Sequence, residues 1–233
     1  GSKGGYLLAP CLKGGKIGVT RSPETTEPLL ICCLVEAFFI VSIGHTDGDS
    51  ADFRMALDCG ATGFTHLFNA MSPLLARAPG AVGAALESLT AWCGVIVDGR
   101  HVDPVVLKIA LRTRPRNRFM LLTDAMPTVG STDKRFVLQG REIVVEDGVC
   151  VAPDGTLAGS DLDMATAVRN AVSMLDLDLA EAARMASRYP AEFLGLGGEL
   201  GRIAEGYRAN LVLMDDDLQV RETWIDGRPN PEG

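Results

Sequence analysis

Several features are scarce in this sequence, and each scarcity excludes a class of protein. Basic residues are outnumbered, because 22 Lys and Arg face 30 Asp and Glu and leave a net charge of −8. This balance is unfavourable for binding nucleic acid, whose phosphate backbone attracts clustered Lys and Arg. No uncharged apolar run reaches the ~18 residues that a membrane-spanning helix needs, since Glu36 interrupts the most apolar stretch, 29–43. The sequence therefore predicts neither a nucleic-acid nor a membrane partner.

Paired cysteines and an export signal are also missing. The six cysteines include no Cys-x-x-Cys pair, so no zinc knuckle is predicted. Most of them lie in apolar surroundings, which is typical of buried, reduced thiols. Residues 1–10 lack the basic segment followed by an apolar one that opens a signal peptide. These features predict a cytoplasmic protein.

The chain does contain enough apolar residues, 47% of 233, to form a real core. Residues 1–37 show neither a helical nor a strand period and are predicted to be irregular. After them, short apolar runs alternate with helical segments, which predicts βαβ units around a parallel sheet. The predicted strands are 38–43, 62–66, 91–97 and 119–123, and the predicted helices between them are 49–59, 81–89 and 104–112.

The second half of the chain has a different pattern. The turn signals Gln139-Gly140 and Asp147-Gly148 predict a β-hairpin insert at about 135–152. Capping-box patterns at Ser160 and Asp178 predict the starts of two helices. We therefore predict three parts, which are an irregular segment over 1–37, a (β/α) portion over 38–200 and a C-terminal β segment over 201–233.

Polar side chains follow four consecutive predicted strands. The chain has only three histidines, and His45, His66 and His101 each come at a predicted strand end, while Asp124 follows the next strand. In parallel α/β sheets the chemistry collects at the C-terminal ends of the strands. Neutral imidazoles hold a Zn²⁺-like ion with a water, whose pKa the metal lowers and whose proton a nearby carboxylate takes. The pattern predicts a metal-dependent hydrolase.

Longer motifs surround these residues, from about residue 40 to the C-terminus. The most specific is His66-Leu67-Phe68-Asn69-Ala70-Met71. In chain order the others include Gly44-His45-Thr46-Asp47, Arg77-x-Pro79-Gly80, Asp98-Gly99-x-His101-Val102, Thr123-Asp124-Ala125 and Gly155-Thr156-Leu157-Ala158-Gly159-Ser160. The ordered set resembles the N-acetylglucosamine-6-phosphate deacetylases of the amidohydrolase superfamily. The resemblance implies an α/β fold, a partial (β/α)8 TIM-type barrel of amidohydrolase type, with C-terminal β strands of a small second β domain.

The resemblance also implies roles for particular residues. His45 and His66 match metal-binding histidines, and Asp124 matches the carboxylate that deprotonates the metal-bound water and later protonates the leaving amine. The positions that match substrate contacts are Asn69, Ala70, Arg77, His101, Ala158, Gly159 and Ser160, with Arg77 and His101 holding the sugar phosphate. The implied cofactor is a divalent metal, Zn before Fe, Co or Ni, since imidazole serves all of them. The implied partners are a phosphorylated amino sugar and a second copy of the chain in a homodimer.

The residues leave other interpretations open at single positions. Asp124 is also suited to capping the segment that follows it, and Arg77 to being a solvated surface charge. Ser160 is suited to capping a helix, alone or together with a substrate contact. Asp47 and Asp103 are predicted to be surface or capping residues rather than metal ligands.

The implied reaction is deacetylation of N-acetylglucosamine 6-phosphate to glucosamine 6-phosphate and acetate, which is hydrolysis of a linear amide. One alternative is another amidohydrolase, such as a cyclic amidase or a deaminase, but only a phosphorylated substrate needs both Arg77 and His101. The other is a catalytically inactive, truncated fragment that acts as a binding module. That alternative arises because the family's His-x-Glu-Gly-Pro motif, whose Glu binds metal, is not in this sequence, and Glu24 is not predicted to replace it.

Overall fold

Six strands form the central sheet of the computed structural model, in the order β1-β2-β3-β4-β5-β6. The structure describes residues 7–10, 16–20 and 28–230. β1 and β2 are antiparallel, and each later strand pairs in parallel with the one before it. The strands are β1 (Leu7–Pro10), β2 (Lys16–Thr20), β3 (Phe39–Ile43), β4 (Gly63–Phe64), β5 (Trp92–Ile96) and β6 (Phe119–Leu122).

Helices connect the parallel strands, as the alternating pattern predicts. They are α1 (Pro28–Glu36), α2 (Ser50–Asp58), α3 (Gly80–Glu87) and α4 (Pro104–Thr113). Asp49 caps α2, since its side chain accepts from two backbone N–H groups of the first turn. Asp103 caps α4 by accepting from the Val105 N–H, and a proline in the first turn suits a helix start. The prediction that Asp103 is a capping residue is confirmed.

The prediction of an irregular segment over 1–37 is wrong for the described part of it. β1, β2 and α1 lie there, and β2 aligns with β3 from Lys16 opposite Phe39 to Thr20 opposite Ile43. α1 has no acidic residue in its first turn and no basic residue in its last, so the charged end signals of a helix are missing. β2 includes the strand formers Ile17, Val19 and Thr20, but Gly18 interrupts them, so its apolar run is shorter than that of β3 or β5.

The main core lies between the parallel sheet and its helices. Phe53 of α2, Phe64 of β4 and Phe119 of β6 are fully buried. Every residue of β5 is buried, as expected for a parallel strand that is covered on both faces. Three later helices, α5 (Met164–Leu175), α6 (Leu179–Ala186) and α7 (Arg188–Phe193), pack against β6. No helix among the described residues is long and apolar enough to cross a membrane.

The helix predicted to start at Ser160 starts later. Asp163 is the N-cap of α5 and accepts from the Thr166 N–H at 2.8 Å, whereas Ser160 is the last residue of a strand. The capping prediction for Asp178 is confirmed, because its side chain accepts from the N–H of Glu181 at the start of α6. The prediction that Ser160 caps this helix is therefore wrong, because Asp163 is the N-cap.

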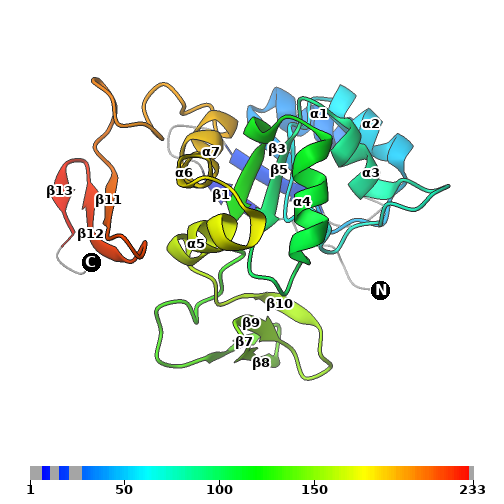
Figure 1. The fold of residues 1–233 in the computed structure, drawn as a ribbon. Helices are drawn as coiled ribbons and strands as arrows, with labels where there is room; N and C mark the ends of the chain where they lie inside the picture. The colour runs from blue at the N-terminus through cyan, green and yellow to red at the C-terminus, as the bar shows by residue number, and fades with distance from the viewer. Residues whose placement is uncertain (1–6, 11–15, 21–27, 231–233) are drawn as a thin grey trace.

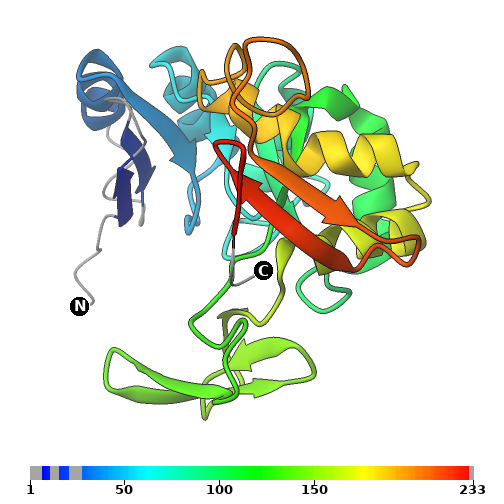
Figure 2. The ribbon, with the colours of Figure 1, turned by 90° about the vertical axis from the view of Figure 1, so that its left-hand side faces the viewer.

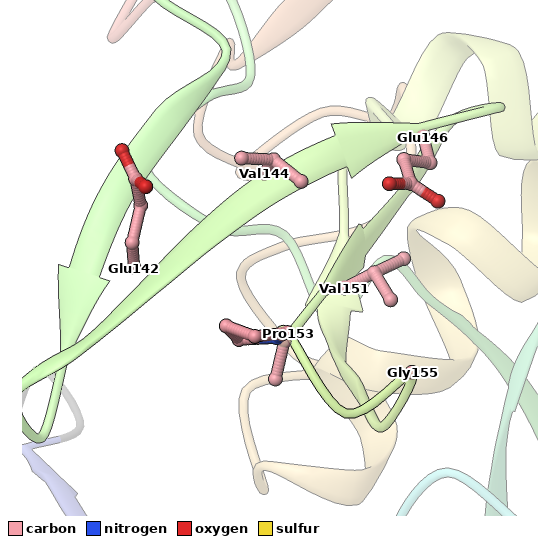
Figure 3. Close-up of a pocket in the computed structure, with 7 residues that line it drawn as sticks. Glu142, Val144, Glu146, Val151, Pro153 and Gly155 are labelled. Atoms are coloured by element: carbon pink, nitrogen blue, oxygen red, sulfur yellow. The ribbon is translucent and has the colours of Figure 1, made fainter.

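A separate four-stranded antiparallel sheet, in the order β10-β9-β8-β7, follows β6 (Figures 1 and 2). It contains β7 (Arg135–Leu138), β8 (Arg141–Glu146), β9 (Val149–Val151) and β10 (Leu157–Ser160). The predicted hairpin insert is thus present and is extended by β10. A hollow of about 250 Å³ on this sheet, lined by residues that include Glu142, Glu146 and Pro153, contains none of the predicted site residues (Figure 3).

The chain ends in a three-stranded antiparallel sheet (Figure 1). It contains β11 (Leu211–Met214), β12 (Val220–Ile225) and β13 (Arg228–Pro229). A hydrogen bond ties it to the helical layer, because Arg169 of α5 donates to the backbone oxygen of Leu218 at 2.8 Å. The predicted C-terminal β segment is therefore present within 201–233.

Candidate metal and substrate site

Two of the predicted metal ligands meet at the carboxyl edge of the sheet. His45 follows β3 and His66 lies two residues after β4, and these strands are parallel neighbours. Their Nε2 atoms are 2.8 Å apart, and their ring centroids are 4.6 Å apart with an interplanar angle of 78°. His66 is buried, with 6% of its surface exposed, whereas His45 and the neighbouring Asp47 are exposed. The predicted metal pair is thus brought together, and Asp47 is a surface residue as predicted.

Glycines and an unusual backbone permit this close approach. His45 has φ 50° and His66 has φ 26°, in the left-handed region that side chains seldom adopt. A Cβ on Gly44 would overlap the Thr65 side chain and lie 3.6 Å from Cε1 of His66. A Cβ on Gly94 would overlap the Leu122 side chain beside the His66 backbone. Residues held in such strained conformations cluster at active sites, because the surrounding structure must fix them there.

The His45–His66 pair fits a divalent metal. Two imidazole nitrogens on one tetrahedral zinc are about 3.3 Å apart, given Zn–N distances of about 2.0–2.1 Å, and the two Nε2 atoms here are already nearly that close. His66 Nδ1 is buried and has no hydrogen-bond partner among the described residues. In the described part of the chain, no cluster of three or more His, Cys, Asp or Glu gathers around a possible metal position. Glu24 lies outside the described residues, so His45 and His66 are the two candidate ligands that the described part of the chain brings together.

Asp124 lies at the end of β6, on the same edge of the sheet. It is exposed and has φ 52°, and it caps no helix among the described residues. The backbone of β10 holds it, because the Ser160 N–H donates to the Asp124 carbonyl at 2.9 Å and the Met126 N–H donates to the Ser160 carbonyl at 2.9 Å. A parallel bridge between Ala125 and Ser160 completes this contact.

Ser160 is fully buried, and its hydroxyl has two partners inside the protein. The hydroxyl donates to the backbone oxygen of Thr123 and accepts from the Leu162 N–H at 3.1 Å. Of the predicted substrate contacts, Gly159 and Ser160 therefore lie directly beside the Asp124 backbone, whereas Ala158 packs against the core of the antiparallel sheet. With the hydroxyl occupied in this way, the side chain of Ser160 supports the site from within.

Asn69 and Ala70 follow His66 in the loop after β4. The Asn69 side-chain amide donates to the backbone oxygens of His66 at 3.2 Å and Leu67 at 3.4 Å. Ala70 is exposed with φ 48°, and its carbonyl accepts from the Thr46 N–H at 2.9 Å. The Asn69 bonds lie within the loop that carries His66, and the Thr46–Ala70 bond joins this loop to the one that carries His45.

Arg77 differs from the other predicted site residues. It lies in a loop, 73–79, in which every residue is exposed. No ion pair of Arg77 occurs among the described residues. The structure thus leaves Arg77 on the surface and does not bring it against the histidine pair.

His101 forms a buried pair with a residue that the site prediction omits. Its Nδ1 lies 2.5 Å from Oδ2 of Asp98, and the two side chains are only 3% and 6% exposed. Burial raises the pKa of Asp98, but hydrogen bonds from the His101 ring and from two backbone N–H groups outweigh it and leave the pKa below its ordinary value. The motif Asp98-Gly99-x-His101 is visible in the sequence, but the contact between its two ends is not.

The geometry agrees with a comparison of the whole sequence. Residues 15–229 match the amidohydrolase family. The chain belongs to this family. It is 44% identical over 209 residues to an N-acetylgalactosamine-6-phosphate deacetylase of Shewanella sp. (strain ANA-3), and 36% identical over 211 residues to an N-acetylglucosamine-6-phosphate deacetylase of Vibrio furnissii. Each alignment covers 90% of this chain and 53% of the relative.

Solved structures of amidohydrolases show the same fold. The crystal structure of N-acetylglucosamine-6-phosphate deacetylase from Pasteurella multocida superposes with a TM-score of 0.86 at 35% identity, covering 91% of this chain and 55% of that one. The chain spans about half the length of the curated relatives and solved structures it matches. The predictions of family and of a partial amidohydrolase barrel are therefore confirmed, and membership of the family implies a divalent metal cofactor.

Proposed function

We propose that this chain carries the metal-binding and proton-transfer residues of an N-acetylglucosamine-6-phosphate deacetylase. The observation that carries the proposal is the 2.8 Å approach of His45 and His66, at the same sheet edge as Asp124. When bound there, a divalent metal supplies a water whose pKa is lowered toward neutrality. Asp124 would take a proton from the attacking water and would return it to the leaving nitrogen, so that hydrolysis of the amide gives acetate and an amine.

The substrate's phosphate is the second element of the proposal. Arg77 and His101 would hold it, because a phosphate dianion favours an Arg fork together with a second donor. Asn69, Ala70, Ala158 and Gly159 would line the sugar, with Ser160 behind them. The net charge of −8 does not prevent anion binding when cationic groups focus the local field.

The finer details are also proposals. Zinc is the proposed metal, since it favours sites in which imidazoles leave a position for water. A homodimer is proposed in which Arg77, on its exposed loop, would contribute to the phosphate site of the second copy. A cytoplasmic location is proposed because most of the cysteines lie in apolar surroundings, which is typical of buried, reduced thiols.

N-acetylgalactosamine 6-phosphate is the second candidate substrate. The relative at 44% identity is named for this sugar, and so is one from Escherichia coli O157:H7 at 40%. The two sugars differ only in the configuration at C4, so one catalytic arrangement serves both. Measuring kcat/KM for each sugar with the same preparation decides between them, and the higher value identifies the preferred substrate.

Acetate release from N-acetylglucosamine 6-phosphate, with added Zn²⁺, tests the reaction. We expect Asp124→Asn to lower the rate by about 10²–10⁴-fold, because general acid–base catalysis contributes that much. Asp133→Asn is the matched control, since Asp133 is also exposed and lies in the loop before β7. Equal rates for the wild-type and Asp124→Asn proteins would refute the assigned role. A folded wild-type chain that binds zinc without turnover would instead support the binding-module alternative.

The metal pair has its own test. Titrating Zn²⁺ into ¹⁵N-labelled protein is expected to shift the ring nitrogens of His45 and His66 and to leave those of His101 unchanged. His66→Ala should weaken zinc binding, because it removes one of the two converging nitrogens. A zinc response at His101 alone would contradict the assignment.

A further inference from the structure

The Asp98–His101 pair has the geometry of a device that orients a histidine. Asp98 comes two residues after β5, at the sheet edge that also carries His45, His66 and Asp124. Its side chain is 6% exposed and that of His101 is 3% exposed. Burying a carboxylate costs free energy unless it is fully hydrogen-bonded. The hydrogen-bond partners of Asp98 therefore indicate its role.

The two oxygens of Asp98 have different partners. Oδ1 accepts the backbone N–H groups of Arg100 and His101, both at 2.8 Å. These two bonds prevent the carboxylate from turning, and they leave Oδ2 facing Nδ1 of His101 at 2.5 Å. An ionised carboxylate only accepts hydrogen bonds, so the ring must carry its proton on Nδ1. Nε2 is then the one ring nitrogen left for a ligand.

We propose that Asp98 is a positioning residue for substrate recognition, which holds the proton of His101 on Nδ1 and presents Nε2 to the phosphorylated sugar. The inference rests on the proposed function, since that function supplies the ligand. When His101 gains a second proton, Nε2 becomes a charged donor to a phosphate oxygen, and Asp98 balances the positive charge. Such charge-assisted bonds are roughly twice as strong as neutral ones.

The variant Asp98→Asn tests the orientation of the ring directly. The two backbone N–H groups must still meet an acceptor, so the amide oxygen takes the place of Oδ1 and the NH₂ group faces Nδ1. The NH₂ group can only donate, and we therefore expect the ring proton to move to Nε2. Two-dimensional ¹H–¹⁵N spectra of histidine side chains report the tautomer. Only three histidines are present, and His101→Gln identifies the signal. An unreversed tautomer in Asp98→Asn would overturn the orienting role.

Binding of the sugar tests the consequence for recognition. We expect Asp98→Asn to bind N-acetylglucosamine 6-phosphate about tenfold more weakly, which is the difference between a charged and a neutral hydrogen bond. Affinity for unphosphorylated N-acetylglucosamine should not change. In kinetics KM should rise with little change in kcat, because the phosphate lies away from the reacting amide.

Asp103→Asn is the matched control. Asp103 lies in the same loop and caps α4, so this variant loses stability without changing the tautomer of His101 or the affinity. Equal affinity of the wild-type and Asp98→Asn proteins for the phosphorylated sugar would overturn the proposal. If the wild-type chain binds neither sugar, the proposed function fails, whereas the tautomer comparison still decides whether Asp98 orients the ring.

Discussion

Gly159→Ala is the substitution whose effect on the site can be worked out most directly. Gly159 has φ +99°, and a Cβ there would lie 2.5 Å and 2.7 Å from Cε and Cγ of Met126 and 2.9 Å from the carbonyl oxygen of Asp124. The Met126 side chain can rotate away. The Asp124 carbonyl cannot, because it accepts the Ser160 N–H at 2.9 Å. The added methyl group therefore pushes β10 away from the residue that carries the proposed proton transfer.

The expected loss in the free energy of unfolding of Gly159→Ala has two parts. Placing an L-residue in the left-handed region costs about 1–2 kcal/mol, and overpacking a filled site adds about 1–3 kcal/mol. Gly155→Ala separates them, because Gly155 has φ +81° but no atom within 4 Å of its ideal Cβ. We expect the free energy of unfolding to fall by about 2–5 kcal/mol in Gly159→Ala, and by only the backbone part in Gly155→Ala.

Urea denaturation of both variants gives these free energies, and acetate release gives the rate. Gly159→Ala should also lower kcat, because Asp124 is displaced, whereas Gly155→Ala should keep the wild-type kcat in the folded protein. Equal stability losses in the two variants would refute the reasoning. They would mean that β10 moves freely and does not position Asp124.

Three further predictions concern buried groups. Arg114→Leu should lower the free energy of unfolding by about 2–4 kcal/mol, measured in urea, because the buried guanidinium donates to the carbonyls of Ala85 and Ala91. Burial raises the pKa of Cys93 from 9.0 to about 12, so the unfolded thiol ionises first. Stability should fall between these pH values by up to about 1.4 kcal/mol per pH unit, and Cys93→Ala should lack this component. The pKa of Asp98 lies below its ordinary value, so its contribution to stability should be present above that ordinary value and be lost as pH falls through the lower one. Asp98→Asn should lack this acid-side loss in denaturation measured at several pH values.

The parallel sheet could be predicted because its main strands are continuous apolar runs, of which β5 is the clearest. β2 and α1 could not, since Gly18 interrupts the short apolar run of β2, which pairs with β3, and α1 has no charged end signals. A local sequence pattern also gives a wrong prediction where the same residue type can either cap a helix or make a distant hydrogen bond. Ser160 has the spacing of a helix cap, but its hydroxyl donates to Thr123, 37 residues away in sequence, and no local pattern shows such a bond.

The candidate site was predictable to the extent that topology fixes it. His45, His66 and Asp124 follow strands of one parallel sheet, so their shared edge follows from the strand order alone. The function of Asp98 depends on which oxygen faces which donor, and this is decided by side-chain geometry. The exposed position of Arg77 likewise follows from the conformation of its loop.

The backbone at the site is strained, and the hydrogen bonds next to the strained residues hold the site in place. Left-handed φ values occur at His45, His66, Ala70 and Asp124. Each costs on the order of 1–3 kcal/mol and persists only where neighbouring structure fixes it. The fixing contacts are the hydrogen bonds from Thr46 N–H to Ala70 O, from Leu67 N–H to Gly94 O and from Ser160 N–H to Asp124 O. All of them join residues between β3 and β10, so the positions of the histidine pair and of Asp124 depend on this region of the chain.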